Sequence, residues 1–233
     1  MGNKRIIAII VFFLLFITVG TSEANEKVGE NEMAWIGGNR YLSSAEMQNN
    51  ARIIYEYLLE KGWSVNAICA VIGNMEVESK INPNVWESLT VNINRGYGLV
   101  QWTPSTKLSD WCTENGLDYT DGYAQLERII YESDNGIQWF QNPAVTPSNP
   151  PITFKQFTTS NLPLETLANY WCWYYEHPAE EYLYGRGQYA LYWYSYLTGE
   201  EPPTPTPTPV PTPSDIRKMP VWMMCRAKHL RLR

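Results

Sequence analysis

Two glutamates near the middle of the chain, Glu78 and Glu87, are the side chains best placed for acid–base chemistry. An apolar run at helical spacing precedes Glu78, and Asn82-Pro83 stops the predicted helix just after it. Glu78 is therefore expected at the C-terminal end of a buried helix, with little positive charge nearby. Desolvation there favours the protonated carboxyl group, which a general acid needs near neutral pH. These features make Glu78 a candidate proton donor.

Glu87 lies nine residues further on, where polar turn-forming residues alternate with apolar ones. This pattern suits a small β-hairpin or a long loop. A carboxylate on such a segment can face a cleft and activate a water molecule, so Glu87 is the candidate for a second catalytic group. An ordinary solvated loop glutamate is the alternative.

The segment from Gly96 to Trp102, GYGLVQW, has the composition of a sugar-binding surface. Its two glycines allow close backbone approach, and Tyr97, Gln101 and Trp102 offer polar tips and flat faces that can line a groove. Trp86 can stack on a sugar ring in the same way. Since the chain has 10 tryptophans and 16 tyrosines, a place in the core is the alternative for each aromatic residue. A glutamate beside such a surface suggests glycan cleavage.

The order and spacing of these motifs resemble the phage tail lysozyme family, which is related to goose lysozyme and the soluble lytic transglycosylases. The matching motifs are Cys69, Gly73-Asn74-Met75, Glu78-Ser79, Ile81-Asn82-Pro83, Trp86, Gly96 to Trp102, and Tyr175-Glu176-His177-Pro178. The resemblance covers about Tyr41 to Leu197. It implies an α+β, mostly α, lysozyme-like fold with a small β-hairpin beside the catalytic cleft, and it places Glu78 at the catalytic-glutamate position.

The resemblance also implies an activity. It points to a peptidoglycan muramidase that cleaves the β-1,4 bond between N-acetylmuramic acid and N-acetylglucosamine, with Glu78 as general acid. A lytic transglycosylase, which acts with one glutamate and leaves anhydro ends, is the alternative. Glu176 stands where the family has an acid, and we expect it to bind substrate or to bond the neighbouring backbone. His177 departs from the family's arginine, which puts any guanidinium contact at that position in doubt.

Two rival functions come from other classes of protein. A non-catalytic peptidoglycan-binding module would fit the change at His177 and the uncertain second carboxylate. A structural assembly protein would use its aromatic surfaces to bind a partner. The complete motif around Glu78 argues against both.

Helical periodicity predicts one mostly helical domain over residues 40–198. A capping box at residues 43–46 begins the first helix, which ends before Gly62. Further helices are expected after Pro104 and over residues 121–137, 162–175 and 187–197. A domain of this size can bury its own core.

The two ends of the chain differ in composition from the middle. Residues 1–24 have the pattern of a signal peptide, with an uncleaved membrane anchor as the alternative. We therefore expect a secreted or extracytoplasmic protein. If the segment is not cleaved, the protein is attached to the cell surface. Residues 25–39 suit a flexible tether, and residues 199–213 a proline–threonine linker. Residues 214–233 carry a net charge of +5, against −12 for residues 25–213. This basic tail is interpreted as the remnant of a missing module, with attachment to anionic wall polymers as the alternative.

The sequence predicts no metal, no cofactor and no nucleic-acid partner. The two histidines form no zinc-binding pattern, and neither a phosphate loop nor a basic patch with interleaved aromatic residues is present. We expect a monomer that acts on peptidoglycan glycan strands and meets a membrane only through its N-terminal segment. Cys69 is predicted to be a buried apolar residue, and pairing of Cys112 with Cys172 stays open.

Overall fold

The computed structural model describes residues 33–143, 148–177 and 185–203. Residues 1–24, most of the tether, most of the linker and the basic tail lie outside these ranges, so the predictions made for them stay predictions. Within the described ranges no helix is both long enough and apolar enough to cross a membrane.

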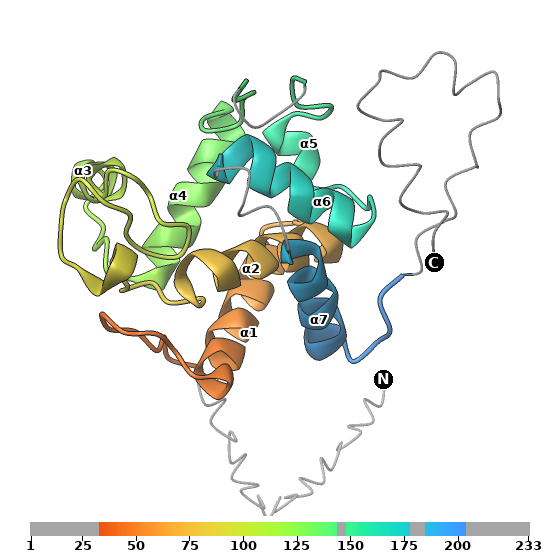
Figure 1. The fold of residues 1–233 in the computed structure, drawn as a ribbon, viewed down its shortest axis with the longest axis horizontal. Coiled ribbons are helices and arrows are strands. Elements are labelled where there is room, and N and C mark those ends of the chain that lie inside the picture. Colours follow the sequence, from red (N-terminus) through yellow and green to blue (C-terminus); the bar gives the residue numbers. More distant parts are fainter. Residues whose placement is uncertain (1–32, 144–147, 178–184, 204–233) are drawn as a thin grey trace, which may run out of the picture. The chain divides into compact units, whose positions relative to one another are not determined.

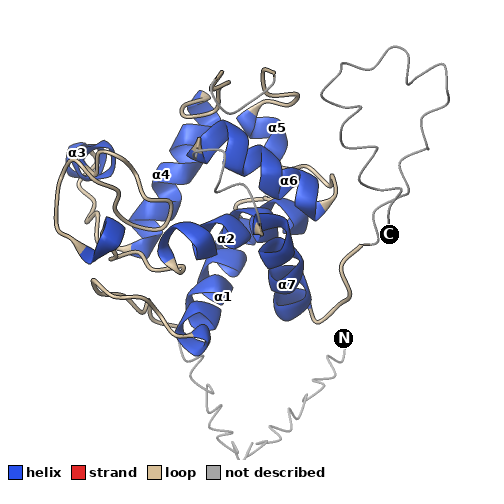
Figure 2. Cartoon of the chain, in the orientation of Figure 1, coloured by secondary structure: helices blue, strands red, loops and turns tan. Residues whose placement is uncertain are grey.

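The described part of the chain is mostly helical (Figures 1 and 2). The helices, in chain order, are α1 (Ser44–Glu60), α2 (Val65–Ser79), the 3₁₀ turn η1 (Glu87–Leu89), α3 (Thr106–Glu114), α4 (Gly122–Asn135), α5 (Phe154–Thr158), α6 (Leu164–Trp171), the π-helical turn η2 (Cys172–Glu176) and α7 (Arg186–Thr198). The predicted helices are confirmed, except that the single helix expected over residues 162–175 is divided into α6 and η2. This helix-rich architecture is consistent with a lysozyme-like fold.

Helix α2 is the central element of the domain. It packs against α1, α6 and α7, and Figure 1 shows it crossing the middle of the helical group. Every residue from Asn66 to Met75 is buried, as expected for a helix with neighbours on several sides. Gly73 permits the close packing with α7, because a Cβ atom there would lie 2.7 Å from the backbone nitrogen of Ala190.

The two ends of α2 are fixed by hydrogen bonds. Ser64 caps the N-terminus by accepting from the amide of Ala67. At the other end Ser79 donates its hydroxyl to the carbonyl of Leu99 at 2.8 Å, which connects the helix to the segment 96–102. The chain then leaves the helix through Lys80, whose φ of 56° lies in the left-handed region. The last turn of α2 therefore has a defined position relative to the loop that follows it.

The β-hairpin predicted beside the cleft is not confirmed. The segment after α2 contains η1 and two isolated bridges, which pair Tyr97 with Trp86 and with Trp102. Residues 87–95 are exposed to solvent, so no alternating buried face exists there to fix a strand register. The structure instead has a loop that is closed at its base by these bridges.

The three cysteines that the structure describes are buried free thiols: Cys69, Cys112 and Cys172. The first confirms the expectation of a buried apolar residue, and the other two do not pair. Burial raises the pKa of the Cys69 thiol to about 12. Such a thiol is neutral and unreactive at neutral pH.

Candidate functional site

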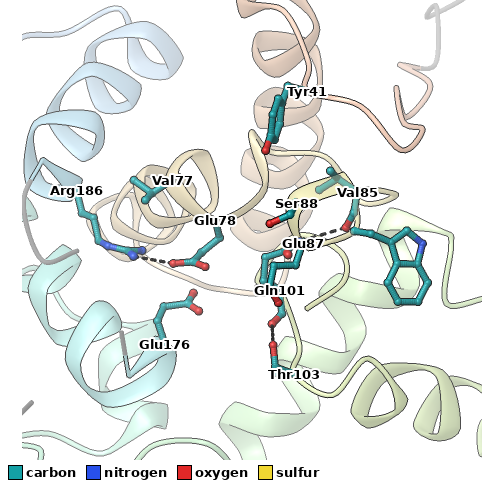
Figure 3. Close-up of a pocket in the computed structure, with 11 residues that line it drawn as sticks. Tyr41, Val77, Glu78, Val85, Glu87, Ser88, Gln101, Thr103, Glu176 and Arg186 are labelled. Carbon is teal, nitrogen blue, oxygen red and sulfur yellow. Dashed lines mark hydrogen bonds and ion pairs between the residues drawn. The ribbon is translucent and has the colours of Figure 1, made fainter. Parts of the chain in front are cut away.

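A cavity of about 590 Å³ opens beside the C-terminal end of α2. It is lined by Tyr41, Val77, Glu78, Val85, Trp86, Glu87, Ser88, Gln101, Thr103, Glu176 and Arg186. Figure 3 shows Glu78, Glu176 and Arg186 gathered on one side and Glu87, Ser88 and Gln101 on the other. We call these two sides the helical wall and the loop wall.

The helical wall is organised by Arg186, the first residue of α7. Its guanidinium donates to Glu78 Oε1 at 2.6 Å and to Asn74 Oδ1 at 3.0 Å. Glu78 and Asn74 lie four residues apart on α2, so they share one face of that helix. The side chain of Arg186 is 1% exposed and that of Glu78 is 20% exposed. The expectation that little positive charge surrounds Glu78 is therefore wrong.

Glu176 completes the helical wall from the end of η2. Its Oε1 accepts a hydrogen bond from Trp171 Nε1 at 2.6 Å. Burial raises the pKa of Glu176 well above its usual value, and the neighbouring Glu78 carboxylate raises it further, while Arg186 and the Trp171 hydrogen bond act in the opposite direction. The helical wall thus has two carboxyl groups around one guanidinium, and Glu176 holds a proton at pH values where an exposed glutamate has lost it.

The loop wall is more exposed and is held by backbone contacts. Glu87 and Gly96 bond in both directions: the backbone amide of Glu87 donates to the carbonyl of Gly96 at 2.9 Å, and Glu87 Oε2 accepts from the amide of Gly96 at 3.1 Å. The side-chain amide of Gln101 donates to the carbonyls of Val85 and Gly98. These bonds keep Glu87 and Gln101 at the edge of the cavity. Trp86 lines the same edge and is half-buried.

Two of the predicted sugar-binding residues do not line this cavity. Tyr97 is buried against the rings of Trp86 and Tyr119, and its hydroxyl accepts from the side-chain amide of Asn84. Trp102 is also buried, and lines a smaller adjoining cavity of about 150 Å³ to which Glu176 also contributes. Tyr97 thus supports Trp86 of the loop wall, whereas Trp102 faces the smaller cavity.

Two buried polar side chains that no sequence motif indicated hold Trp102 and the backbone around Tyr97. Glu132 accepts hydrogen bonds from Trp102 Nε1, from the hydroxyl of Tyr175 and from Arg128. Gln125 accepts from the amide of Leu99 and donates to the carbonyl of Pro83. Both residues lie on the buried face of the amphipathic helix α4. The signal for them in the sequence is a polar residue at a position where the helical pattern calls for an apolar one.

The imidazole of His177 does not enter the cavity wall. It packs edge-on against Phe140, with ring centroids 4.1 Å apart, and neither ring nitrogen has a hydrogen-bond partner among the described residues. Burial, together with the nearby charge of Lys107, lowers the pKa of His177. The guanidinium in this site comes from Arg186 on α7, which no motif in the sequence indicated.

The composition of the cavity suits acid–base chemistry by side chains. Two carboxyl groups and a guanidinium face a third carboxylate across a space large enough for a sugar residue. Within the described residues, no group of three or more histidine, cysteine, aspartate or glutamate side chains is placed to hold a metal ion.

Comparisons with known proteins place this geometry in context. Residues 49–197 match the family described as phage tail lysozyme. The chain is also 45% identical, over 163 residues, to morphogenesis protein 1 of Bacillus phage B103. That alignment covers 70% of this chain and 43% of the relative, so the chain spans less than half of the relative's length. The matched segment contains both walls of the cavity, and the chain belongs to the phage tail lysozyme family.

Proposed function

We propose that this chain cleaves the glycan strand of peptidoglycan at the β-1,4 bond between N-acetylmuramic acid and N-acetylglucosamine. The observation that carries the proposal is the cavity with carboxyl groups on both walls, in a chain that belongs to a lysozyme family. Cleavage of a glycosidic bond needs a proton for the leaving oxygen and stabilisation of an oxocarbenium-like centre. The two walls supply groups for both tasks.

Glu78 delivers the proton in this proposal. The Glu78–Glu176 pair surrounds one guanidinium, and the raised pKa of Glu176 keeps one proton on the pair. Both carboxyl groups line the cavity. The proton held by Glu176 moves to Glu78, which stands at the family's catalytic-glutamate position, and Glu78 passes it to the leaving oxygen. Both carboxylates are then anionic, with Arg186 as their partner, and they stabilise the positive charge that develops on the sugar ring.

Glu87 is proposed as the second catalytic group. It faces the helical wall across the cavity, where a carboxylate can activate a water molecule for hydrolysis (Figure 3). Gln101 and Trp86 hold the sugar at the same edge. If a substrate hydroxyl attacks in place of water, the same site acts as a lytic transglycosylase and forms anhydro ends without Glu87.

Digestion of purified peptidoglycan, with the soluble products resolved by mass spectrometry, tests the proposal. A muramidase releases fragments with reducing ends at N-acetylmuramic acid, and a transglycosylase releases anhydro fragments. Glu78→Gln serves as the control that assigns the products to this cavity. Sedimentation of the protein with the wall without release of fragments would instead identify a non-catalytic binding module.

A further inference from the structure

The smaller cavity of about 150 Å³ adjoins the main cavity directly, and we call it the side cavity. Three residues line both cavities: Gln101, Thr103 and Glu176 (Figure 3). The volume of the side cavity is below the roughly 300 Å³ at which typical ligand pockets begin. It therefore suits one substituent of a ligand whose main part occupies the larger cavity. The rest of its lining consists of Val100, Trp102, Lys107, Gln138 and Tyr175.

The aromatic walls of the side cavity are fixed by one buried carboxyl group. Glu132 accepts hydrogen bonds from Trp102 Nε1 at 3.2 Å and from the hydroxyl of Tyr175. Both aromatic residues are buried. The side-chain amide of Gln138 donates to the carbonyl of Tyr175 at 3.2 Å, which connects a third lining residue to this wall. Because these side chains are already held, a ligand that enters the side cavity does not have to order them.

Lys107 brings a positive charge to the side cavity. It is the second residue of α3, and it is exposed. No carboxylate in the described ranges forms an ion pair with it, Glu176 included. Its charge helps to lower the pKa of His177, so the ammonium group lies near the end of η2. The side cavity is thus bordered by a cation that a ligand can reach.

The charges around the side cavity favour an anion. Glu176 is the one carboxyl group among the described lining residues, and burial raises its pKa well above the usual value. While Glu176 holds its proton, the lining has the positive charge of Lys107 and no negative charge. A carboxylate of a ligand can then form a charge-assisted hydrogen bond with the ammonium group.

We propose that the side cavity binds a carboxylate carried by the lactyl group of N-acetylmuramic acid, with Lys107 as its partner. This inference rests on the proposed function for the identity of the glycan strand. Two carboxylates have this chemistry. One belongs to the lactyl group itself in a strand without peptide, and the other is the nearest carboxylate of a peptide attached to it. N-acetylglucosamine has neither, so Lys107 selects the N-acetylmuramic acid residue for the position beside Glu176.

Calorimetric titration of the full chain with two matched pairs of ligands tests the proposal. The first pair is the disaccharide N-acetylglucosaminyl-β-1,4-N-acetylmuramic acid and its lactyl methylamide. The second pair is the same disaccharide with an alanyl-glutamate peptide on the lactyl group, and the diamide of that peptide. We expect the acid of at least one pair to bind about fivefold more tightly than its amide. The pair that shows this preference identifies the source of the carboxylate.

The result does not depend on whether the chain cleaves glycan. None of the four ligands contains the bond from N-acetylmuramic acid to N-acetylglucosamine that the proposed function breaks. A preference for the acid in a chain that releases no fragments from peptidoglycan would reject the proposed function and retain this inference.

Variants assign the preference to the side cavity. Lys107 is exposed and forms no ion pair with a described residue, so Lys107→Gln should fold normally and bind acid and amide equally. Lys107→Arg keeps the charge and should keep most of the preference. Lys155→Gln is the matched control, because Lys155 is an exposed lysine on α5 that lines neither cavity, and it should keep the full preference. Equal affinity within both pairs, undetectable binding included, would overturn the proposal, as would a preference that survives in Lys107→Gln.

Discussion

The helical wall and the loop wall of the main cavity are built in different ways. Glu78, Glu176 and Arg186 come from helix ends, are largely shielded from water and bond one another or buried groups. Glu87 and Gln101 lie on a segment with no regular strands, and their bonds go to nearby backbone groups. The helical wall thus holds its charged groups through buried side-chain contacts, whereas the loop wall holds its side chains through hydrogen bonds to the backbone at the solvent edge.

Replacing Arg186 should have the largest effect, because it removes the centre of the helical wall. Arg186→Met leaves Glu78 and Glu176 facing each other without the guanidinium. We expect a loss of about 3 kcal/mol in the free energy of unfolding, measured in urea. The rate of fragment release should fall about 100-fold.

Arg186→Lys sharpens this test. A lysine keeps the charge, but its single ammonium group cannot reproduce the forked contact with Asn74 and Glu78. We expect intermediate stability and intermediate activity. Unfolding of Arg186→Met within about 1 kcal/mol of the unmodified chain would show that the helical wall does not depend on this charge.

Glu176 should make stability depend on pH. Its pKa is raised in the folded protein, so between its unfolded pKa, about 4.3, and its folded pKa the folded state binds the extra proton. Stability contributed by that proton is present at low pH and decreases as pH rises through this interval. Glu176→Gln has no such proton. Its free energy of unfolding, relative to the unmodified chain, should therefore rise with pH by up to about 1.4 kcal/mol per pH unit.

Urea unfolding at pH 5, 6 and 7 would check this prediction. Carboxyl groups that do not interact with Glu176, such as Glu46, are present in both proteins and cancel in the difference. Parallel curves for the two proteins would mean that Glu176 is not held in its protonated form.

Substitution of Glu87 should affect activity alone. Glu87→Gln keeps an oxygen for the amide of Gly96, so we expect the free energy of unfolding to change by less than about 0.5 kcal/mol. If Glu87 activates water, fragment release should fall about 10- to 100-fold. Glu114→Gln, an exposed glutamate on α3, is the control. Full activity in Glu87→Gln would show that Glu87 is an ordinary solvated glutamate without a catalytic role. That result would favour the transglycosylase mechanism.

Tyr97→Phe should have the smallest effect. The ring is 3% exposed, and its hydroxyl accepts one hydrogen bond from Asn84. We expect a loss of about 1 kcal/mol in the free energy of unfolding and no change in KM for soluble glycan. A tenfold rise in KM would show that Tyr97 contacts the sugar after all.

The sequence predicted the parts of the site that depend on local pattern. Glu78 was placed at the end of a buried helix because apolar spacing and the Asn82-Pro83 stop are signals within one segment. The predicted position of Glu87 on a loop beside the cleft also agrees with the structure, although the hairpin does not. Residues 87–95 have a turn-forming composition, but they are exposed and form no buried face that would define strands.

The parts that the sequence could not predict depend on contacts between distant segments. Arg186 lies 108 residues from Glu78, and no local pattern distinguishes it from a solvated arginine at the start of a helix. The burial of Tyr97 depends in the same way on packing against Tyr119. Composition could not separate core aromatic residues from those on the cavity, because both use the same side chains.

The most direct test of the central claim is the rate of soluble fragment release from peptidoglycan by Glu78→Gln beside the unmodified chain. The amide oxygen of the glutamine still accepts from Arg186, but the buried guanidinium loses a charged partner, so we expect a folded variant whose free energy of unfolding in urea is lower by about 1–3 kcal/mol. We predict a loss of at least about 1,000-fold in rate, because the proton donor is missing. Retention of more than about a tenth of the rate by a folded Glu78→Gln protein would contradict the assignment of Glu78 as the acid.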